Sequence, residues 1–582
     1  MLESILSFIV IFIECCFIGC VGYCVIDCLV NRKSTSSSQL SDSSAIPPSI
    51  IRLVVFGTVV ITVYTEFFSI FASIGLLAHL AIDVPAIVIA VLLKKRFGKL
   101  IYDLWGRLRP IIFSWEGFFY LCFIILVAFY TSRGQFHADT RIYHAQNIRI
   151  YEEYGLIKGM GNLQQHFGYN SASLAFASFF SYGFLLSKPW HTTTGFYMLI
   201  MGLYSFYGLK RFKTHTYHLC DMCKVGILLY LLTNISYSMS PATDYPAMLM
   251  AMFALSEWVG ITERYIENRE SVQIDEYIGI TLLSIFVATL KLSCATMCVL
   301  AVFPIFILIK EKRIKTLILC IVAGLIIVAP FLIRNVLITG WLLYPFDGID
   351  LFDVPWKVPV DKVIYDSDQI KVWGKCLYDV SLKDTPITEW IRVWWNNQES
   401  YQKSLIYANA IGGVLLAISL VRKLIVKKLT FPMVCLYLSI AVSTVAWFLM
   451  APFVRYGLCF LLIIPMLAIG EFLSLKHTGL EYIVSGVLVV GIGLSFSGYI
   501  GNYASDDKVF VGKFGKDPYY IFQQDYAHCE PKTLDMNGNT IYYYDNVEDE
   551  NDYYHCPSSY YEGMAMDCEL MGERIVDGFK PL

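Results

Sequence analysis

The chain has 582 residues, of which 56% are hydrophobic and 16% are charged, and its formal net charge is −3. Soluble domains carry about 25% charged residues, so this composition excludes an ordinary soluble protein. The net charge by itself says nothing about partners, and no basic stripe points to nucleic acid. We expect an all-α protein that crosses a membrane many times.

Apolar runs of about 17 to 28 residues, long enough to span a bilayer, recur along the chain. A hydropathy window of about 19 residues predicts about fourteen transmembrane helices, at residues 3–30, 51–70, 73–93, 112–131, 194–210, 223–239, 246–262, 276–290, 294–310, 316–336, 404–421, 431–449, 456–473 and 480–500. The segment 171–187 is shorter and rich in serine, so we expect an amphipathic helix at the membrane interface there.

Lysine and arginine set the expected orientation, because they are enriched in cytoplasmic loops. Basic loops follow every second predicted span, for example at Lys94-Lys95-Arg96, Lys210-Arg211 and Lys310. This alternation predicts that both termini are extracytoplasmic.

Three regions follow from the predicted spans. They are an N-terminal region, 1–111, with a cytoplasmic linker at 31–50; a transmembrane core, 112–500, with outer loops at 132–193 and 337–403; and an extracytoplasmic tail, 501–582. In the tail, Cys556 and Cys568 are candidates for a disulfide, since an extracytoplasmic compartment is oxidising. The alternative is that these cysteines and Cys529 are free thiols.

The outer loop after the span 112–131 contains Asp139, flanked by His137 and His144. An aspartate here can accept a proton from a hydroxyl group or hold a divalent cation, and the two histidines could join it as ligands or as supporting partners. The alternative is that Asp139 only solvates the end of a helix or caps the next one.

Four further polar residues lie at the outer ends of predicted spans, namely Asp244, Lys291, Arg334 and Arg455. Asp244 is expected to cap a helix that begins at Tyr245 or Pro246, with or without a role in a site. A lysine at such a boundary either snorkels or meets an anion. Arginines at outer ends run against the positive-inside bias and suit a phosphate group, which guanidinium binds through two hydrogen bonds.

Together these residues form the set required to transfer a sugar from a polyprenyl phosphate. An acid activates the acceptor hydroxyl, while cations stabilise the charge that grows on the phosphate leaving group. A double displacement by two close carboxylates is an alternative. The sequence shows no second acid adjacent to Asp139, which favours a single, inverting displacement.

The pattern resembles the GT-C class of polytopic glycosyltransferases, in particular its bacterial mannosyltransferase-like members. The resemblance rests on Asp139 in an outer loop and on the elements "SPATDYPAML", "LKLS", "RNVLITGWLLYP" and "PFVRY", which occur in the order of the class within about 112–500. The class often pairs acids in its first outer loop, whereas this loop reads His137-Ala138-Asp139-Thr140. Three predicted spans also precede the point where the class usually begins.

The chain also resembles a group of bacterial multi-pass membrane proteins that share a D-x-x-x-Y-H outer loop and a tail ending in D-G-F, here "DTRIYH" and "DGF". That resemblance implies no substrate. Around Asp139 and Asp244 as catalytic residues, and Lys291, Arg334 and Arg455 as phosphate-binding residues, we expect acceptor-binding or supporting roles for a further group. It comprises His137, Arg141, Tyr143, His144, Asn162, His166 and Asn170.

These inferences predict a glycosyltransferase in a bacterial inner membrane that uses an undecaprenyl- or dolichyl-phosphate sugar to build cell-surface glycans. The expected partners are that lipid donor, membrane lipids and other proteins of envelope glycan assembly. A divalent cation, Mg²⁺ or Mn²⁺, is left open as a cofactor. Two alternatives remain: a translocase for polysaccharide or lipid carrier, with charged groups along a path through the membrane, and a non-catalytic assembly protein that binds through its tail.

Overall fold

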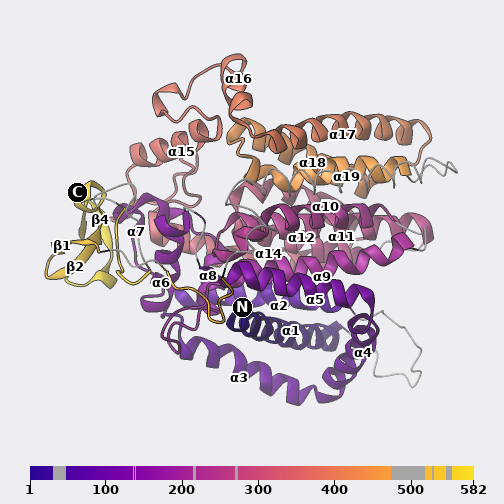
Figure 1. Ribbon diagram of the computed structural model, residues 1–582, viewed down its shortest axis with the longest axis horizontal. Coiled ribbons are helices and arrows are strands. Elements are labelled where there is room, and N and C mark those ends of the chain that lie inside the picture. Colours follow the sequence, from indigo (N-terminus) through magenta and orange to yellow (C-terminus); the bar gives the residue numbers. More distant parts are fainter. Residues whose placement is uncertain are drawn as a thin grey trace.

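The computed structural model describes residues 1–30, 48–134, 137, 139–213, 218–268, 273–473, 518–526, 530–544, 553–560 and 562–582. Its long helices run alongside one another in a bundle (Figure 1). In chain order they are α1 (Leu2–Val30), α2 (Ile50–Ser69), α3 (Leu76–Leu92), α4 (Lys94–Ile112), α5 (Trp115–Thr131), α9 (Thr193–Lys213), α10 (Leu219–Asn234), α11 (Asp244–Asn268), α12 (Ile274–Leu290), α13 (Val302–Lys310), α14 (Ile314–Thr339), α17 (Ser400–Ile425), α18 (Phe431–Met450) and α19 (Val454–Leu473).

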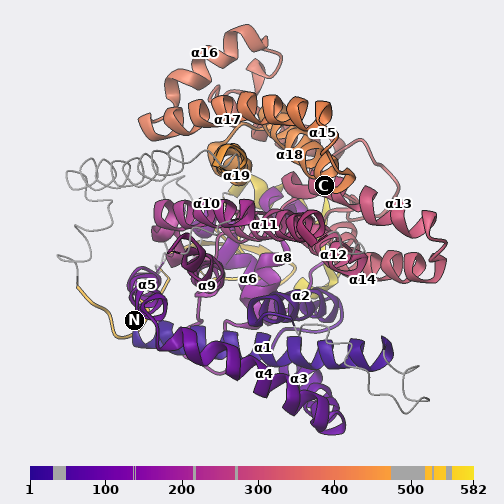
Figure 2. The same ribbon diagram turned by 90° about the vertical axis from the view of Figure 1, so that its right-hand side faces the viewer.

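Shorter elements connect these helices. They are η2 (Thr140–His144), α6 (Ala145–Glu153), α7 (Met160–Leu163), η3 (Gln165–Gly168), α8 (Ala172–Phe179), η4 (Ile235–Met239), η5 (Leu292–Ala301), α15 (Val360–Gly374), η6 (Val380–Leu382) and α16 (Ile387–Asn397). Helices α1, α3 and α4 lie on one flank of the bundle, and α16 and α17 lie on the opposite flank (Figure 2).

Eight helices of the described residues are long and apolar enough to cross a membrane, or up to nine if the bent pair α3–α4 is one span. The chain is therefore a multi-pass helical membrane protein, but the fourteen predicted spans are not confirmed. The predicted spans 194–210, 246–262 and 276–290 form α9, α11 and α12, which do not meet that test. Much of α11 is enclosed by other helices, so it does not need a surface as apolar as one that faces lipid. The predicted span 480–500 lies outside the described residues.

The predicted span 73–93 continues into an unexpected helix. Helix α3 ends at Leu92, and α4 leaves it at an angle of 95°. Helix α4 carries the basic cluster Lys94-Lys95-Arg96 and lies at the end of the bundle opposite α6, α7 and the strands of the tail (Figure 1). One of the predicted basic segments therefore lies at the end of the bundle opposite the tail.

The expectation of an amphipathic interfacial helix at 171–187 is wrong. Helix α8 has eight residues, all of them buried, and it packs against α2 and α6. Three serines of this segment, Ser171, Ser178 and Ser181, donate hydrogen bonds to backbone carbonyls; the Ser171 hydroxyl donates to the Leu290 carbonyl at 2.6 Å. An amphipathic helix is found instead at α16, which buries Trp390 and Trp394 and exposes its charged residues.

Helices α1 and α2 meet at two glycines. An added Cβ would lie 2.0 Å from the Leu53 carbonyl oxygen at Gly19, and 1.8 Å from the Cys15 carbonyl oxygen at Gly57. Small residues of this kind let two membrane helices approach backbone to backbone. The two N-terminal helices α1 and α2 are therefore in direct backbone contact.

We expect Gly57→Ala to destabilise the protein by about 1–3 kcal/mol, because the methyl group forces α1 and α2 apart. Thermal unfolding in detergent micelles measures the change. Gly413→Ala is the matched control, since an added Cβ there has no atom within 4 Å and alanine favours a helix. Equal melting temperatures for the two variants would contradict the close packing.

The described part of the tail contains β-strands, in contrast to the all-α expectation. It contains two antiparallel sheets, β1 (Lys532–Met536) with β2 (Asn539–Tyr543) and β3 (Cys568–Leu570) with β4 (Phe579–Pro581), together with α22 (Glu562–Met566) and η7 (Ile575–Asp577). The Phe579 N–H donates to the Lys158 carbonyl at 2.9 Å, so the tail packs on the loop after α5. The amino group of Met1 bonds the Ile521 carbonyl at 3.1 Å, which places both termini at this end of the bundle.

The predicted disulfide between Cys556 and Cys568 is wrong. Cys568 is a free thiol, and its sulfur donates to the Ala565 carbonyl at 3.5 Å. Because Cys568 is buried in β3 beside β4, its side chain is committed to the small core beneath the tail. Cys529 lies outside the described residues.

Glu152 of α6 receives a hydrogen bond from Tyr553 of the tail. Burial raises the pKa of Glu152 to about 7, so the folded protein holds the proton more tightly than the unfolded chain does. The resulting stability is fully present below the ordinary glutamate pKa and is lost as the pH rises to about 7.

We therefore expect docking of the tail to weaken by up to about 3 kcal/mol as the pH rises through this window. Limited proteolysis of the tail at a series of pH values measures it, and Glu152→Gln should remove the pH dependence. A wild-type cleavage rate that falls with pH, after correction for the protease, would oppose this prediction.

Candidate functional site

Asp139 lies between α5 and η2, where the chain leaves the bundle and turns back over its end. Its Oδ2 is 3.6 Å from His137 Nδ1 and 3.4 Å from Arg455 Nη2. The side chain of Asp139 is 26% exposed, compared with 5% for Asp244. Asp139 is therefore the more exposed of the two carboxylates.

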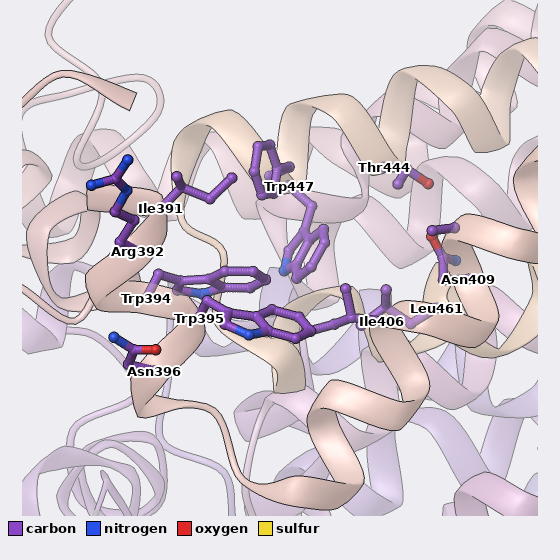
Figure 3. Close-up of a pocket in the computed structure, with 12 residues that line it drawn as sticks. Ile391, Arg392, Trp394, Trp395, Asn396, Ile406, Asn409, Thr444, Trp447 and Leu461 are labelled. Carbon is purple, nitrogen blue, oxygen red and sulfur yellow. The ribbon is translucent and has the colours of Figure 1, made fainter. Parts of the chain in front are cut away.

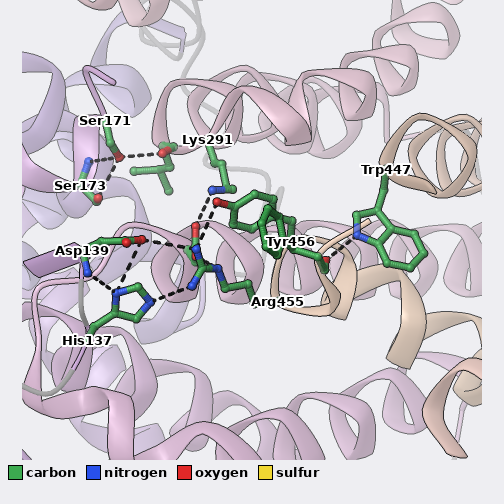
Figure 4. A network of polar contacts seen from close by, with 11 residues as sticks. His137, Asp139, Ser171, Ser173, Lys291, Trp447, Arg455 and Tyr456 are labelled. Carbon is green, nitrogen blue, oxygen red and sulfur yellow. Dashed lines mark hydrogen bonds and ion pairs between the residues drawn. The ribbon is translucent and has the colours of Figure 1, made fainter. Parts of the chain in front are cut away.

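Asp244 lies at the first residue of α11, and both of its oxygens contact cations. Oδ1 forms an ion pair with Lys291, and Oδ2 lies 3.2 Å from Arg455 Nε (Figure 4). The predicted helix start at Tyr245 or Pro246 is thus one or two residues late, which is within the ordinary uncertainty of helix ends. The carboxylate of Asp244 contacts the two cations, Lys291 and Arg455.

Two breaks in the helices bring the cations to Asp244. Lys291 has an extended backbone, φ −156° and ψ 121°, between α12 and η5. Arg455 is the second residue of α19, which follows a turn whose Pro452 and Phe453 carbonyls accept hydrogen bonds from tryptophan side chains, at 2.8 and 2.6 Å. Irregular backbone at membrane depth is tolerated where it is enclosed by protein, and here it lets both cations reach Asp244.

Aromatic rings enclose the cations, a feature that the sequence analysis missed. The Lys291 ammonium lies 3.7 Å from the centroid of the Tyr456 ring, and Arg455 Nη2 lies 3.4 Å from the Tyr456 hydroxyl. Stacked rings of Tyr237 and Tyr245, 4.4 Å apart, lie beside His137. The signal available in the sequence was the tyrosine adjacent to Arg455 in "VRYG".

His137 has two contacts that a neutral ring cannot satisfy at once. Nδ1 accepts a hydrogen bond from the Asp139 N–H at 3.1 Å, and Nε2 is 3.4 Å from Arg455 Nη1. Neutral imidazole has one donor and one acceptor nitrogen. The shorter contact favours the proton on Nε2, in which case this N–H and the Arg455 guanidinium both present donors to the same space.

The charges of the cluster balance. Burial by itself raises the pKa of Asp139, but His137 and Arg455 lower it more, so that its pKa lies below the usual aspartate range. Burial lowers the pKa of His137 and brings that of His144 to about 3. Two carboxylates, Lys291, Arg455 and neutral histidines therefore sum to zero at neutral pH.

A divalent cation does not fit this cluster. Lysine and arginine already contact both oxygens of Asp244, and Arg455 contacts Asp139. Among the described residues, the side chains that lie close enough together to hold a metal ion do not include either aspartate. The cationic side chains take the place that Mg²⁺ or Mn²⁺ would have.

Arg334 belongs to a different network. It is 2% exposed, and its guanidinium donates to Asn170 Oδ1 at 3.2 Å, Ser69 Oγ at 2.5 Å and the Gly155 carbonyl at 3.3 Å. It also lies 4.0 Å from the centroid of the Tyr151 ring. Through these contacts the Arg334 guanidinium connects α14 with α2 and with the loop 132–193. The structure therefore does not bring Arg334 to Asp139.

The other predicted acceptor-binding residues have mainly structural contacts. Asn162 Nδ2 donates to the Gly159 and Trp356 carbonyls at 3.1 and 2.9 Å. His166 stacks on Tyr143 with ring centroids 5.5 Å apart. Asn170 Nδ2 donates to the Phe331 carbonyl at 3.1 Å.

Three predicted residues, Arg141, Tyr143 and His144, lie in η2, beside Asp139. The Thr140 hydroxyl lies 3.3 Å from His144 Nδ1, while His144 Nε2 is buried with no hydrogen-bond partner in the structure. Arg141 is half-buried in the same turn. Of the predicted set, His137 and His144 are therefore the residues that accompany Asp139 at the cluster.

An aromatic cavity of about 700 Å³ lies next to this cluster, between α16, α17, α18 and α19 (Figure 3). It is lined by Trp394, Trp395 and Trp447, with Arg392 among the lining residues. The indoles of Trp394 and Trp447 are the groups that hold the turn before Arg455. Two lining tryptophans therefore connect the cavity to the turn that precedes Arg455.

A family model described as "Domain of unknown function (DUF8201)" matches residues 1–462 of the chain. The matched region includes the N-terminal helices and all of the residues of the cationic cluster. No curated protein and no solved structure matches the chain.

Proposed function

The chain belongs to the DUF8201 family, and we propose that it is an integral membrane glycosyltransferase that uses a polyprenyl-phosphate-linked sugar. The observation that carries the proposal is the convergence of Asp139, Asp244, Lys291 and Arg455, from four distant segments, on one cluster. An accessible carboxylate beside two cations is the arrangement that sugar transfer from a lipid phosphate requires.

In this proposal, Arg455 binds the donor phosphate. Its contacts with Asp139 and His137 are long, at 3.4 Å, and its side chain is 36% exposed, so an anion can replace them. The phosphate oxygens would then receive hydrogen bonds from guanidinium and from His137 Nε2–H. Lys291, bound to Asp244 behind it, adds positive potential to the leaving phosphate.

Asp139 is proposed as the base that accepts the proton of the acceptor hydroxyl. Its lowered pKa keeps it ionised in the resting protein. When phosphate takes Arg455 away from Asp139, the carboxylate loses a stabilising contact and becomes more basic at the moment the reaction needs it.

A single, inverting displacement remains the proposed course, although the argument for it from the sequence no longer holds. The sequence offers no second acid adjacent to Asp139, yet the fold brings Asp244 to the same guanidinium. Asp244 is 5% exposed and saturated by two cations, which makes it a poor nucleophile. Its role is to position Lys291 and Arg455.

The cavity lined by tryptophan suits the hydrocarbon chain of the donor. It is largely apolar and adjoins the turn that carries Arg455, so a phosphate on Arg455 could continue into it as a polyprenyl chain. Tryptophan is also the residue that membranes favour near the headgroup level.

We further propose that this end of the bundle faces the outside of a bacterial inner membrane, with both termini extracytoplasmic. The support is the basic helix α4 at the opposite end, as the positive-inside rule requires of a cytoplasmic face. The product would then be a cell-surface polysaccharide or another envelope glycan.

The test uses the purified chain in proteoliposomes with undecaprenyl-phosphate-linked mannose, glucose, galactose or arabinose and a bacterial envelope extract as acceptor. We expect one donor to release undecaprenyl phosphate and to label the extract in step with time. No release from any donor, together with no saturable binding of undecaprenyl phosphate, would refute the proposal.

A further inference from the structure

Three ionisable side chains meet on the flank of the bundle formed by α1 and α3, on the side away from the tryptophan-lined cavity (Figure 2). They are Glu14, midway along α1, and His79 and Asp83, on one face of α3. Their ligand atoms, one from each residue, all lie within 4.8 Å of one another. Intramembrane ionisable residues are costly and mark functional sites, yet the proposed transfer reaction uses none of these three.

The ring of His79 is held in the orientation of a metal ligand. Its Nε2 lies 3.0 Å from the Phe179 carbonyl and stacking on Tyr182 fixes its plane. A carbonyl can only accept, so Nε2 carries the proton and Nδ1 keeps its lone pair. Nδ1 is the atom that faces Glu14, at 3.8 Å from Oε1. Histidines that bind metals commonly donate their other N–H to a carbonyl in this way.

One carboxylate oxygen of Glu14 has a hydrogen-bond partner in the structure, and the other has none. Oε2 accepts a hydrogen bond from the Tyr182 hydroxyl at 3.2 Å, while Oε1 is buried with no hydrogen-bond partner. A buried oxygen without a partner is costly. Oε1 is also the oxygen beside His79 Nδ1, so one ion between them would satisfy both atoms.

The electrostatics favour a divalent ion. In the part of the chain that the structure describes, no lysine or arginine forms an ion pair with Glu14 or Asp83. The two carboxyl groups concentrate negative charge on a flank whose neighbouring side chains, such as Leu80 and Ile87, are exposed and apolar. One divalent cation cancels that charge, and the imidazole nitrogen favours a transition metal over Mg²⁺ or Ca²⁺.

We propose that Glu14, His79 and Asp83 bind one divalent transition-metal ion, with Zn²⁺ as the ion that the mixed nitrogen and oxygen donors suit. Bonds of about 2 Å require ligand atoms roughly 3–4 Å apart, which small rotations of the two carboxylates provide. A cavity of about 350 Å³, lined by Glu14 and Asp83, adjoins the three residues and leaves room for a fourth ligand such as water. The ion joins α3 to α1 and thereby fixes the N-terminal helices, independently of the proposed transfer reaction.

The experiment uses the full chain in detergent, stripped with EDTA and reloaded with Zn²⁺ or Co²⁺. We expect one Zn²⁺ per chain by mass spectrometry, a rise in melting temperature with Zn²⁺, and a visible Co²⁺ spectrum. Glu14→Gln and Asp83→Asn should lose all three signals. Asp27→Asn is the matched control on α1, because Asp27 pairs with Arg96 of α4, and it should retain them.

Zn²⁺ binding that survives both Glu14→Gln and Asp83→Asn, or an absence of binding by the wild type, overturns the proposal. If the variants fail to fold, X-ray absorption of the Zn²⁺-loaded wild type decides. A shell of one imidazole nitrogen with oxygen ligands supports the site. A shell that contains sulfur, which this chain's many cysteines would supply, refutes it.

Discussion

Arg455→Gln is expected to reduce sugar transfer by on the order of 100- to 1,000-fold, because it removes a charged donor from the developing phosphate charge. It should also weaken the binding of undecaprenyl phosphate, since glutamine offers neither the charge nor the fork of guanidinium. Arg455→Lys keeps the charge but not the guanidinium geometry, so its transfer rate should lie between those of the wild type and of Arg455→Gln. Initial rates and lipid binding in proteoliposomes measure both effects.

The control is Arg422→Gln, an exposed arginine in the last turn of α17, which should transfer at the wild-type rate. Arg455 also holds Asp244 and Asp139, so melting temperatures must accompany the rates. If Arg455→Gln is folded and binds undecaprenyl phosphate as tightly as the wild type does, Arg455 is not the phosphate ligand.

Asp139→Asn should abolish most of the transfer without weakening the donor complex. Loss of a general base costs about 10²- to 10⁴-fold in rate, whereas removal of a negative charge beside Arg455 leaves anion binding equal or tighter. The predicted signature is therefore a large fall in kcat with an unchanged or lower KM for the donor. Asp353→Asn, at an exposed position of the outer loop 337–403, is the control. Full activity of Asp139→Asn would exclude it as the base.

The pH profile distinguishes these two roles further. Because His137 and Arg455 hold the pKa of Asp139 below the usual aspartate range, Asp139 stays ionised into moderately acidic solution, and the acid limb of wild-type activity should lie at low pH. Removing Arg455 raises that pKa, so the residual activity of Arg455→Gln should lose its acid side at a higher pH. If the acid limb of Arg455→Gln lies at the same pH as that of the wild type, Arg455 does not control the pKa of the base in the reaction.

The sequence by itself determined that the chain is a helical membrane protein, since apolar runs of bilayer length leave the backbone no other way to satisfy its hydrogen bonds. It also singled out Asp139, Asp244, Lys291 and Arg455, because charge at the outer end of an apolar run is costly and stands out against its surroundings. These signals come from residues that are close together in the chain, so they can be recognised in the sequence without the fold.

Only the tertiary structure decided which charges meet. Arg334 and Arg455 look alike in sequence, but one lies in a buried network with Asn170 and Ser69 and the other reaches Asp139. The segment 171–187 reads as interfacial, yet α8 is enclosed by α2 and α6. The hydropathy of a segment reflects the free energy of moving its side chains out of water. It does not identify the residues that these side chains contact in the fold. The pairing of Glu14 with His79 and Asp83, and of Asp244 with two cations, therefore appears only when the helices are packed.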